Sequence, residues 1–331
     1  MPKVSVILPV YGVEKYIERC ARSLFEQTLD DIEYIFVDDC TPDRSIEILK
    51  AVLEEYPQRK SFVRIINNQR NLGAAGAKEV GMRQAQGEYL MFTDSDDWID
   101  FDGVEKMYDY ATREDLDIAY SDYYGGYGKS VYDRVNEPNC TDYMDALRLF
   151  LTNGLQGFMP NKIFRRRFLE EADEWLIEGA NALEDLGWCI RLCTHRPKIK
   201  RAPISFYHYV FENPNSVMHS AMRENRIAND IYINMAYALT VIEKCGLSET
   251  FEKEILNLKA ITKERFLGRT KASCKRWLEI YPEATSIAME LPVARGVRFA
   301  KWFLVRGIYL PMLIRMNLYR VKSLFTFKRK Q

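Results

Sequence analysis

Three carboxylates directly follow a short apolar run in the first third of the chain. Asp94, Asp96 and Asp97 come after residues 89–93 and lie within four residues of one another. Carboxylates held this close repel each other, and a divalent cation relieves the repulsion while it also binds phosphate oxygens. The segment therefore predicts either a Mg²⁺ or Mn²⁺ site that binds a diphosphate, or an acidic turn that caps the next helix.

A second acidic pair ends an earlier apolar run. Asp38 and Asp39 follow residues 34–37, and Asp43 comes after Pro42. A carboxylate at the end of a strand can accept the imide N–H of uracil or bind a ribose hydroxyl. For Asp39 the alternative is helix capping, and Asp43 is expected to cap the helix that follows it.

Two further segments carry charge at candidate helix starts. After Asn71 and Leu72, small residues from 73 to 77 open a helix and place Lys78 in its second turn, where a helix N-terminus and a lysine suit phosphate. Tight helix–sheet packing explains the same glycines equally well. Later in the chain, Glu184 and Asp185 either complement a helix dipole or include a general base that deprotonates an acceptor hydroxyl.

The elements that must position these residues follow a regular order. The first 125 residues alternate apolar, β-branched runs with helical patterns, which predicts an α/β fold with a doubly wound, mostly parallel sheet. The expected strands are 4–8, 34–37, 63–66, 89–93 and 118–120, and the expected helices are 14–26, 43–55, 74–85 and 103–113. Ligands of such sheets bind beyond the carboxyl ends of the strands, so we expect the first three charged segments to share one edge.

The second half of the chain has a more mixed pattern. Glycines at 125, 126 and 128 predict a loop, followed by helices at 142–151 and 183–193 and a strand at 204–210. Residues 223–281 have helical periodicity with a break near Gly246. We expect a catalytic domain over 1–220, with a nucleotide-binding half (1–125) and an acceptor half (126–220), a helical extension over 221–290, and a tail over 291–331.

The tail differs from the rest of the chain in charge. The formal net charge is zero, with 47 basic and 47 acidic residues, but no Asp or Glu follows Glu290, whereas ten basic residues do. Aromatic and aliphatic residues alternate with these cations, which is typical of a helix that lies on an anionic membrane surface. The alternative is a pair of helices that pack on the catalytic domain with a solvated basic face.

Composition also bears on the compartment. Seven scattered cysteines suit a reducing environment, and no run reaches the roughly 18 apolar residues of a membrane-spanning helix. We expect a cytoplasmic protein, peripheral on the inner face of the plasma membrane, with no nucleic-acid partner.

The ordered motifs resemble those of family 2 glycosyltransferases of the GT-A fold, especially bacterial enzymes of polysaccharide and O-antigen assembly. The resemblance is carried by residues 4–11, 23–28, 37–43, 71–73 and 87–98, and more loosely by 155–218. It implies a Rossmann-like GT-A domain with a C-terminal helical extension. It also implies inverting transfer of a sugar from a nucleotide diphosphate, expected to be UDP, to a glycan or lipid-linked acceptor.

The resemblance further implies a role for each matching residue. Donor-binding roles are implied for Pro9, Val10, Tyr11, Asp39, Lys78, Asp94 and Ser95. Asp96 is the implied metal ligand, with Asp94 and His208 as further candidates, although packing on a strand is the alternative for His208. Asp185 is the implied catalytic base, and Trp98 and Glu184 are implied on the acceptor side. The chain departs from the family pattern at Gly12, where Asn is frequent, and at Lys78, where Arg is common.

Two other functions are open to the same sequence. A nucleotidyltransferase that makes nucleotide sugars resembles this pattern, but it would carry a Gly-rich, Arg-containing loop after its first strand, where this chain has residues 9–12. A catalytically inactive GT-A scaffold in a membrane-bound assembly complex is the non-enzymatic alternative. The intact Asp39, Asp94, Asp96 and Asp185 favour an active enzyme over a scaffold.

Overall fold

The computed structural model describes residues 1–127, 131–211 and 225–317 of the chain. Two compact units make up the chain, Met1–Cys245 and Gly246–Gln331. The predicted domain limit at residue 220, the loop glycine at 128, the family-like segment 215–218 and the end of the tail (318–331) lie outside the described ranges. The division between the units falls at Gly246, where the helical periodicity is interrupted.

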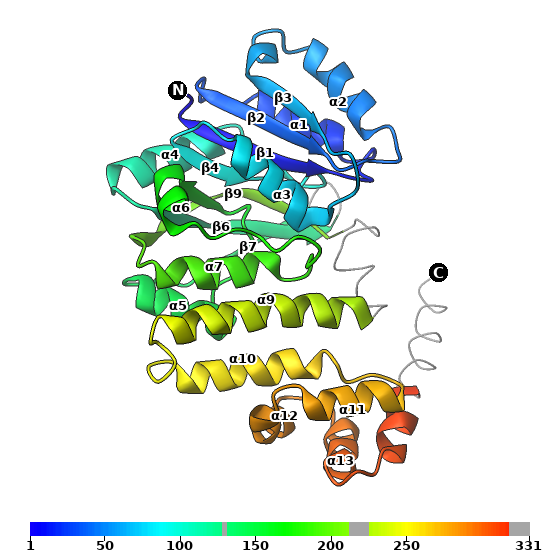
Figure 1. Ribbon diagram of the computed structural model, residues 1–331. Coiled ribbons are helices and arrows are strands. Elements are labelled where there is room, and N and C mark those ends of the chain that lie inside the picture. The colour runs from blue at the N-terminus through cyan, green and yellow to red at the C-terminus, as the bar shows by residue number, and fades with distance from the viewer. Residues whose placement is uncertain (128–130, 212–224, 318–331) are drawn as a thin grey trace. The chain divides into compact units, whose positions relative to one another are not determined.

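The first unit is built on one mixed sheet (Figure 1). Its strands run in the order β3-β2-β1-β4-β8-β6-β9-β5, and β7 pairs with β6. Their bounds are β1 Val4–Val10, β2 Ile32–Asp38, β3 Val63–Asn67, β4 Tyr89–Phe92, β5 Trp98–Ile99, β6 Ile118–Tyr127, β7 Val131–Val135, β8 Lys162–Arg165 and β9 Ile199–Val210. The predicted parallel arrangement is confirmed for β3, β2, β1 and β4. The sheet is not mostly parallel throughout, because β8, β7 and β5 join it antiparallel.

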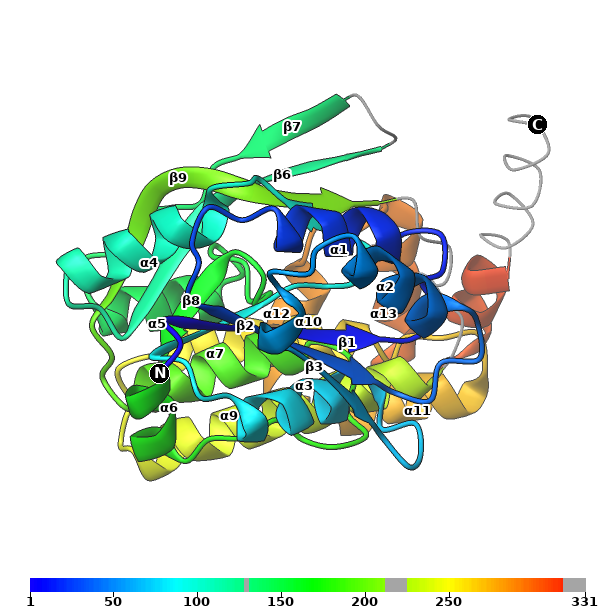
Figure 2. The same ribbon diagram turned by 90° about the horizontal axis from the view of Figure 1, so that it is seen from above.

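Helices cover both faces of this sheet (Figure 2). The helices of the first unit are α1 Ile17–Phe25, α2 Ser45–Glu54, α3 Gly73–Gln84, α4 Gly103–Arg113, α5 Tyr143–Leu151, α6 Arg166–Ala172, α7 Glu184–Thr194 and α9 Asn225–Lys244, with a 3₁₀ turn η1 at Lys60–Phe62. Apolar residues of α1, α2 and α4 share one buried cluster with the sheet. On the opposite face, Trp188 of α7 packs on Phe92 of β4 with ring centroids 6.1 Å apart. The predicted doubly wound α/β architecture is therefore confirmed.

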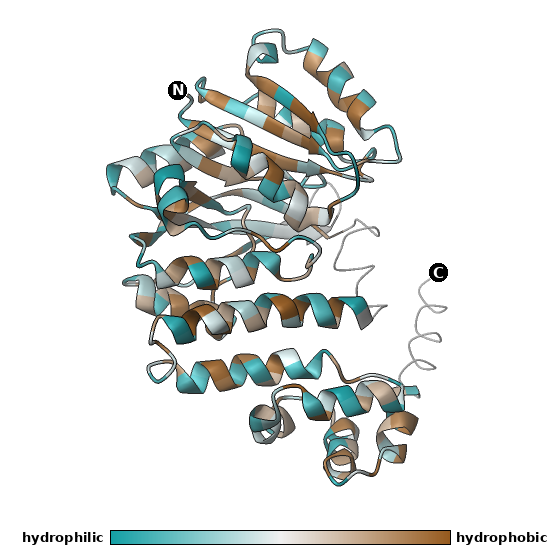
Figure 3. Ribbon diagram, viewed as in Figure 1, coloured by the Kyte–Doolittle hydropathy of each residue, from teal (hydrophilic) through white to brown (hydrophobic). Residues whose placement is uncertain are grey.

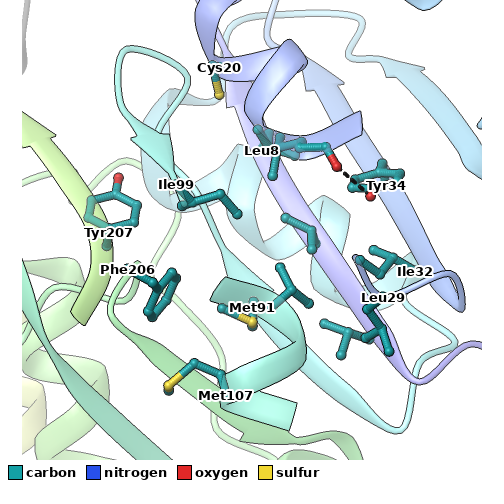
Figure 4. Close-up of a cluster of buried hydrophobic side chains, with 14 of the residues drawn as sticks. Leu8, Cys20, Leu29, Ile32, Tyr34, Met91, Ile99, Met107, Phe206 and Tyr207 are labelled. Carbon is teal, nitrogen blue, oxygen red and sulfur yellow. Dashed lines mark hydrogen bonds between the residues drawn. The ribbon is translucent and has the colours of Figure 1, made fainter. Parts of the chain in front are cut away.

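Strand alternation determines which side chains enter the first cluster. Val4, Val6, Leu8 and Val10 occupy every second position of β1 and are fully buried in it. Figure 4 shows part of this cluster, where the Tyr34 phenol also donates a hydrogen bond of 2.6 Å to the backbone oxygen of Leu24 in α1. Burial of these side chains is the main source of stability for the sheet that positions the site.

The predicted loop at Gly125 and Gly126 is wrong, because β6 continues through both residues. There β6 pairs with β7 on one side and with β9 on the other, so the backbone groups of both glycines are used in the sheet. A Cβ atom at position 125 would lie 2.9 Å from the ring of Phe211. Glycine here therefore provides room for a neighbouring side chain, which is a common reason for glycine within a strand.

The second unit is helical, with α10 Glu252–Glu264, α11 Lys271–Glu279, η2 Pro282–Ala284, α12 Thr285–Glu290 and α13 Arg295–Leu304. Its largest buried side chain is Trp277, and the ammonium groups of Lys263 and Lys301 lie 4.6 and 5.9 Å from the centroid of that indole. Figure 3 shows hydrophilic and hydrophobic residues interspersed along α9 and α10. That pattern is expected of helices that bury one side only.

Candidate active site

The carboxyl ends of β1, β2 and β4 meet at one edge of the sheet, as predicted. Val10 pairs with Asp38, and Ile7 pairs with Phe92, so the segments that follow these strands begin side by side. Hydrogen bonds join them: the Ser95 hydroxyl donates to the Pro9 oxygen at 2.7 Å. These contacts hold the acidic segment after β4 against the end of β1.

The residues after β1 contribute unequally to this edge. Pro9 is partly exposed, and Tyr11 is 53% exposed. The side chain of Val10 is fully buried in the apolar cluster that the sheet shares with α1, α2 and α4, because strand alternation directs it into the core. The predicted contact of Val10 with a nucleotide would therefore involve its backbone, and it stays a prediction, as it does for Pro9 and Tyr11. The Val10 backbone oxygen accepts a hydrogen bond of 3.1 Å from the N–H of Asp39.

Asp39 is buried and binds the start of α3. Its two carboxylate oxygens accept hydrogen bonds of 2.8 Å from the backbone N–H groups of Leu72 and Gly73, and one oxygen also accepts from the Asn68 amide at 2.9 Å. This is the capping arrangement named as the alternative for Asp39, but the capped helix is α3, after the neighbouring strand, and not α2, which follows Asp39 in sequence. Contact with a nucleobase stays a prediction for this residue.

The three carboxylates after β4 point to different surroundings. Asp97 is buried, and its oxygens accept hydrogen bonds from the Tyr207 hydroxyl and, at 2.7 Å, from the Val210 N–H of β9. Burial raises the pKa of Asp97 well above its usual range, and the charges of Asp96 and Asp94 raise it further. Asp97 therefore anchors the turn to β9, whereas Asp94 and Asp96 stay partly exposed.

Lys78 contacts carboxylates from two segments of the chain. Its ammonium is buried and lies 3.0 Å from Oε1 of Glu184 and 4.0 Å from Oδ1 of Asp94. Burial by itself lowers the pKa of Lys78, but the carboxylates of Glu184, Asp94 and Asp185 outweigh this effect and raise it above its usual range. Lys78 is therefore a permanent cation that joins the edge of the sheet to the start of α7.

The adjacent Glu184 and Asp185 at the start of α7 have different surroundings. Glu184 is buried against Lys78, and burial raises its pKa to about 7, with Lys78 opposing the shift and Asp185 adding to it. Asp185 stays partly exposed, and its Oδ1 accepts a hydrogen bond of 2.7 Å from the N–H of Leu186. The Glu184 carboxylate thus pairs with Lys78, and its predicted place on the acceptor side stays a prediction, while the carboxylate of Asp185 remains partly exposed.

Tyr209 of β9 shows that the acidic residues share one region. Burial raises the pKa of its phenol first, and four nearby carboxylates raise it further. These carboxylates belong to Asp94, Asp97, Asp96 and Asp185. The sequence did not distinguish Tyr209 from its neighbours, although it lies within residues 155–218, which carry the looser part of the family resemblance. Asp94, Asp96 and Asp185 come from two distant segments, and the charges of all three act on this one phenol.

Trp98 and His208 form an aromatic stack. They are partners in the β5–β9 pairing, and their rings are 3.5 Å apart and nearly parallel, at 8°. The ring of Tyr124 also stacks on His208 at 4.7 Å, and His208 Nε2 lies 2.8 Å from Oδ1 of Asp100. His208 is thus packed on a strand, which was the alternative to metal binding, and we do not assign it to a metal site.

Comparison with known proteins relates this geometry to a family. Residues 5–172 match the glycosyl transferase family 2 profile, which is about half of the chain. The chain belongs to glycosyl transferase family 2. The matched range contains the edge formed by β1, β2 and β4 but ends before Glu184 and Asp185, which the fold brings to the same edge.

Two relatives of this family 2 chain are glycosyltransferases from bacteria. It is 31% identical over 230 residues to the uncharacterized glycosyltransferase EpsJ of Bacillus subtilis, covering 66% of this chain and 63% of EpsJ. It is 26% identical over 259 residues to TarS of Staphylococcus aureus, a poly(ribitol-phosphate) beta-N-acetylglucosaminyltransferase, covering 77% of this chain and 43% of TarS. The chain thus spans less than two thirds of either relative.

Solved structures share the GT-A fold of this family 2 chain. TarS 1–349 in complex with UDP-GlcNAc matches with a TM-score of 0.62 at 17% identity, covering 97% of this chain and 92% of that one. The mannosyltransferase PcManGT of Pyrobaculum calidifontis, in complex with GDP-Man and Mn²⁺, matches with a TM-score of 0.54 at 17% identity, covering 96% and 83%. The fold class expected from the sequence is therefore confirmed.

The side chains at the edge fit a cation that is bound together with substrate. Within residues 1–127, 131–211 and 225–317, no group of three or more His, Cys, Asp or Glu side chains is arranged to hold a metal ion by itself. Mg²⁺ typically takes one or two carboxylates and completes its coordination with water and substrate phosphates. Asp94 and Asp96 are two partly exposed carboxylates on one turn, so this donor set suits a metal bound with a diphosphate.

Proposed function

We propose that this chain is an inverting glycosyltransferase that moves a sugar from a nucleotide diphosphate donor to a glycan or lipid-linked acceptor in cell-surface polysaccharide synthesis. The observation that carries the proposal is that the buried ammonium of Lys78 lies 4.0 Å from Asp94, after β4, and 3.0 Å from Glu184, the neighbour of Asp185 at the start of α7. Membership of family 2 supports the reaction class. A UDP-sugar is the proposed donor, supported by the likeness to the TarS complex with UDP-GlcNAc.

Asp185 is the proposed general base. It accepts the proton of an acceptor hydroxyl as the hydroxyl oxygen attacks the anomeric carbon of the donor sugar. The bond from that carbon to the diphosphate oxygen breaks in the same in-line step, so the configuration inverts and UDP leaves with the bonding electrons. Asp185 suits this role because it is the partly exposed carboxylate of its pair, while the neighbouring Glu184 is bound to Lys78.

Asp96, together with Asp94, is proposed to hold Mg²⁺ or Mn²⁺. When bound, the cation supplies positive charge that stabilises the leaving diphosphate. The Lys78 ammonium lies close to the carboxylates of Asp94 and Glu184, and its positive charge offsets their negative charge. This role uses the point charge of a lysine and does not require the planar fork of the arginine common at this position.

The remaining residues are proposed to orient the substrates. Pro9, Tyr11, Ser95 and the Asp39 segment lie at the edge where the nucleotide would bind, and Trp98 is proposed to border the acceptor. The peripheral location on the inner face of the plasma membrane, through residues 291–331, belongs to the same proposal, since a lipid-linked acceptor is held at that surface. An inactive scaffold with this fold is the second candidate, and turnover separates the two.

The test is release of nucleoside diphosphate from a panel of UDP-, GDP- and TDP-sugars, with and without Mg²⁺ or Mn²⁺. We expect release from a UDP-sugar that needs the metal, and we expect Asp185→Asn to lower turnover at least about a hundredfold. Asp30→Asn is the matched control, because the Asp30 side chain is 97% exposed and precedes the amino end of β2. Unchanged turnover in Asp185→Asn contradicts the base assignment, and a preference for GDP- or TDP-sugars contradicts the proposed donor.

Donor binding can be followed separately from turnover by thiol alkylation. Cys40 is exposed and directly follows Asp39, and Cys245, at the end of the first unit, is also exposed. A bound UDP-sugar should slow alkylation of Cys40 several-fold but leave Cys245 unchanged, in the wild type and in Asp185→Asn alike. Protection of Cys40 without any turnover would instead favour the inactive scaffold.

A further inference from the structure

Exposed apolar side chains concentrate in one segment of the second unit. Fourteen large hydrophobic side chains are exposed among the described residues, and six of them lie between positions 299 and 314. These six are Phe299, Trp302, Val305, Ile308, Leu310 and Ile314, with 38% to 64% of each side chain exposed. Single exposed hydrophobics are normal on protein surfaces, but a cluster within sixteen residues marks an interaction site.

Helix α13 carries the first part of this cluster on its outward side. Its inward side is formed by Ala300, Lys301 and Leu304, all of which are buried. Residues 295, 298, 299 and 302 are exposed and lie on the opposite side of the helix. A surface helix normally presents polar residues of both charges to water. Here the exposed side holds two aromatic rings and two arginines.

The charge of this segment has one sign. No Asp or Glu occurs from 291 onward, and the one lysine in α13, Lys301, is buried and pairs with Glu264 at 2.6 Å. Within residues 291–317, the exposed cations are therefore arginines, at 295, 298 and 306. The guanidinium of Arg306 lies 3.6 Å from the ring centroid of Trp302 and donates to its backbone oxygen.

The residues that follow extend the same pattern. Residues 310–317 are helical, and Leu310 and Ile314, four positions apart, are 64% and 52% exposed. Residues at this spacing lie on one side of a helix. We call the exposed arginines and large hydrophobic residues of this segment the aromatic–basic face. It consists of Arg295, Arg298, Phe299, Trp302, Val305, Arg306, Ile308, Leu310 and Ile314.

We propose that the aromatic–basic face docks on a lipid bilayer that contains anionic headgroups. Indole and phenyl rings insert at the boundary between headgroups and acyl chains, and arginines beside them bind lipid phosphates. A second copy of this chain is a poorer occupant, since a symmetric contact would place arginines of the two copies against each other. The inference deepens the peripheral location proposed above, but it does not depend on the transfer chemistry.

Vesicle binding by the full chain tests the proposal. We expect binding to phosphatidylcholine vesicles that contain roughly one third phosphatidylglycerol, and much weaker binding to phosphatidylcholine alone. The double variants Phe299→Ser with Trp302→Ser, and Arg298→Glu with Arg306→Glu, should each weaken binding about tenfold or more. Phe101→Ser is the matched control, because Phe101 is 63% exposed but lies in the first unit, and it should bind as the wild type does.

Other outcomes would overturn the proposal. Equal binding to neutral vesicles would contradict the requirement for anionic headgroups. No loss of binding in either double variant would exclude this face as the docking surface. An oligomer in lipid-free solution that dissociates in the Phe299→Ser, Trp302→Ser variant would assign the face to a second copy of the chain. Quenching of the wild-type tryptophan fluorescence by brominated lipid tests insertion without any substitution. UDP release with a water-soluble acceptor, measured on the same proteins, shows separately whether the proposed catalysis holds.

Discussion

At the scale of single residues, the buried pair of Lys78 and Glu184 is the feature that organises the site. The two charges are 3.0 Å apart, and both side chains are less than 10% exposed. A buried ion pair adds little net stability, but loss of one partner leaves an uncompensated charge in the interior. Because Lys78 is shared with Asp94, the same ammonium reduces the repulsion between the carboxylates of the donor side and those of α7.

Lys78→Met should therefore destabilise the chain and inactivate it. We expect a loss of about 3 kcal/mol in the free energy of unfolding, because Glu184 stays buried near Asp185 without its cation. Urea unfolding measures the loss. The double variant Lys78→Met, Glu184→Gln should recover most of the stability without recovering turnover. Equal stability of Lys78→Met and the wild type would show that the pair is not formed in solution.

At the scale of elements, α3 connects the parts of the site. Asp39 binds its first N–H groups, the Asn181 side chain accepts from the N–H of Ala75 at 3.0 Å, and Lys78 extends from its second turn. The helix can approach β1 closely because position 81 is glycine. A Cβ atom there would lie only 2.3 Å from Cγ2 of Ile7, a fully buried residue of β1.

Gly81→Ala is expected to push α3 away from the sheet. The added methyl group overpacks the contact with Ile7, which should cost about 1–3 kcal/mol of stability and lower turnover by displacing Lys78. The matched variant is Gly81→Ala combined with Ile7→Ala, which removes the opposing methyl. In a double-mutant cycle, the double variant should lose less free energy of unfolding than the sum of the losses of the two single variants. Additive effects would mean that the two residues do not touch.

At the scale of the whole molecule, the two units are stabilised differently. The first has a large sheet-based core, whereas the helical second unit holds two lysines against Trp277. Lys263 donates to the backbone oxygen of Ile280 at 2.7 Å, and burial lowers its pKa to about 8. An unfolded lysine titrates near 10.4, so between these two values the unfolded chain binds more protons than the folded one.

The second unit should therefore become more stable as the pH rises from about 8 to 10. Below pH 8 the Lys263 ammonium is buried in its charged form, and the free-energy cost of removing this charge from water destabilises the folded state. That cost disappears as Lys263 loses its proton. We expect the free energy of unfolding, measured in urea, to rise by roughly 1 to 2 kcal/mol. This is less than the full pKa shift would correspond to, because solvent screens part of the charge. Lys263→Met removes this titration, so the gain should be absent from that variant. A parallel pH dependence in the two proteins would contradict the assignment.

Local patterns in the sequence determined the secondary structure of the first half and the edge where its acidic segments meet. Apolar runs of period two and helical runs of period 3.6 were sufficient to predict β1 to β4 and their helices, with boundaries shifted by a few residues. Helix α4 was predicted at its observed bounds, Gly103–Arg113. Parallel strands linked by helices must end on the same side, so the placement of Asp39 and Asp94 at one edge of the sheet followed from chain order alone.

Only the tertiary structure decided which of these side chains remain available for chemistry. Glu184 and Asp185 are adjacent in sequence, yet one is buried on Lys78, 106 residues earlier, and the other is partly exposed. Asp96 is likewise partly exposed and Asp97 buried. The hydrogen-bond partners of Asp97 come from β9, which lies more than a hundred residues later in the chain. Sequence periodicity specifies local geometry, whereas burial and charge pairing depend on neighbours that are brought together only when the sheet is complete.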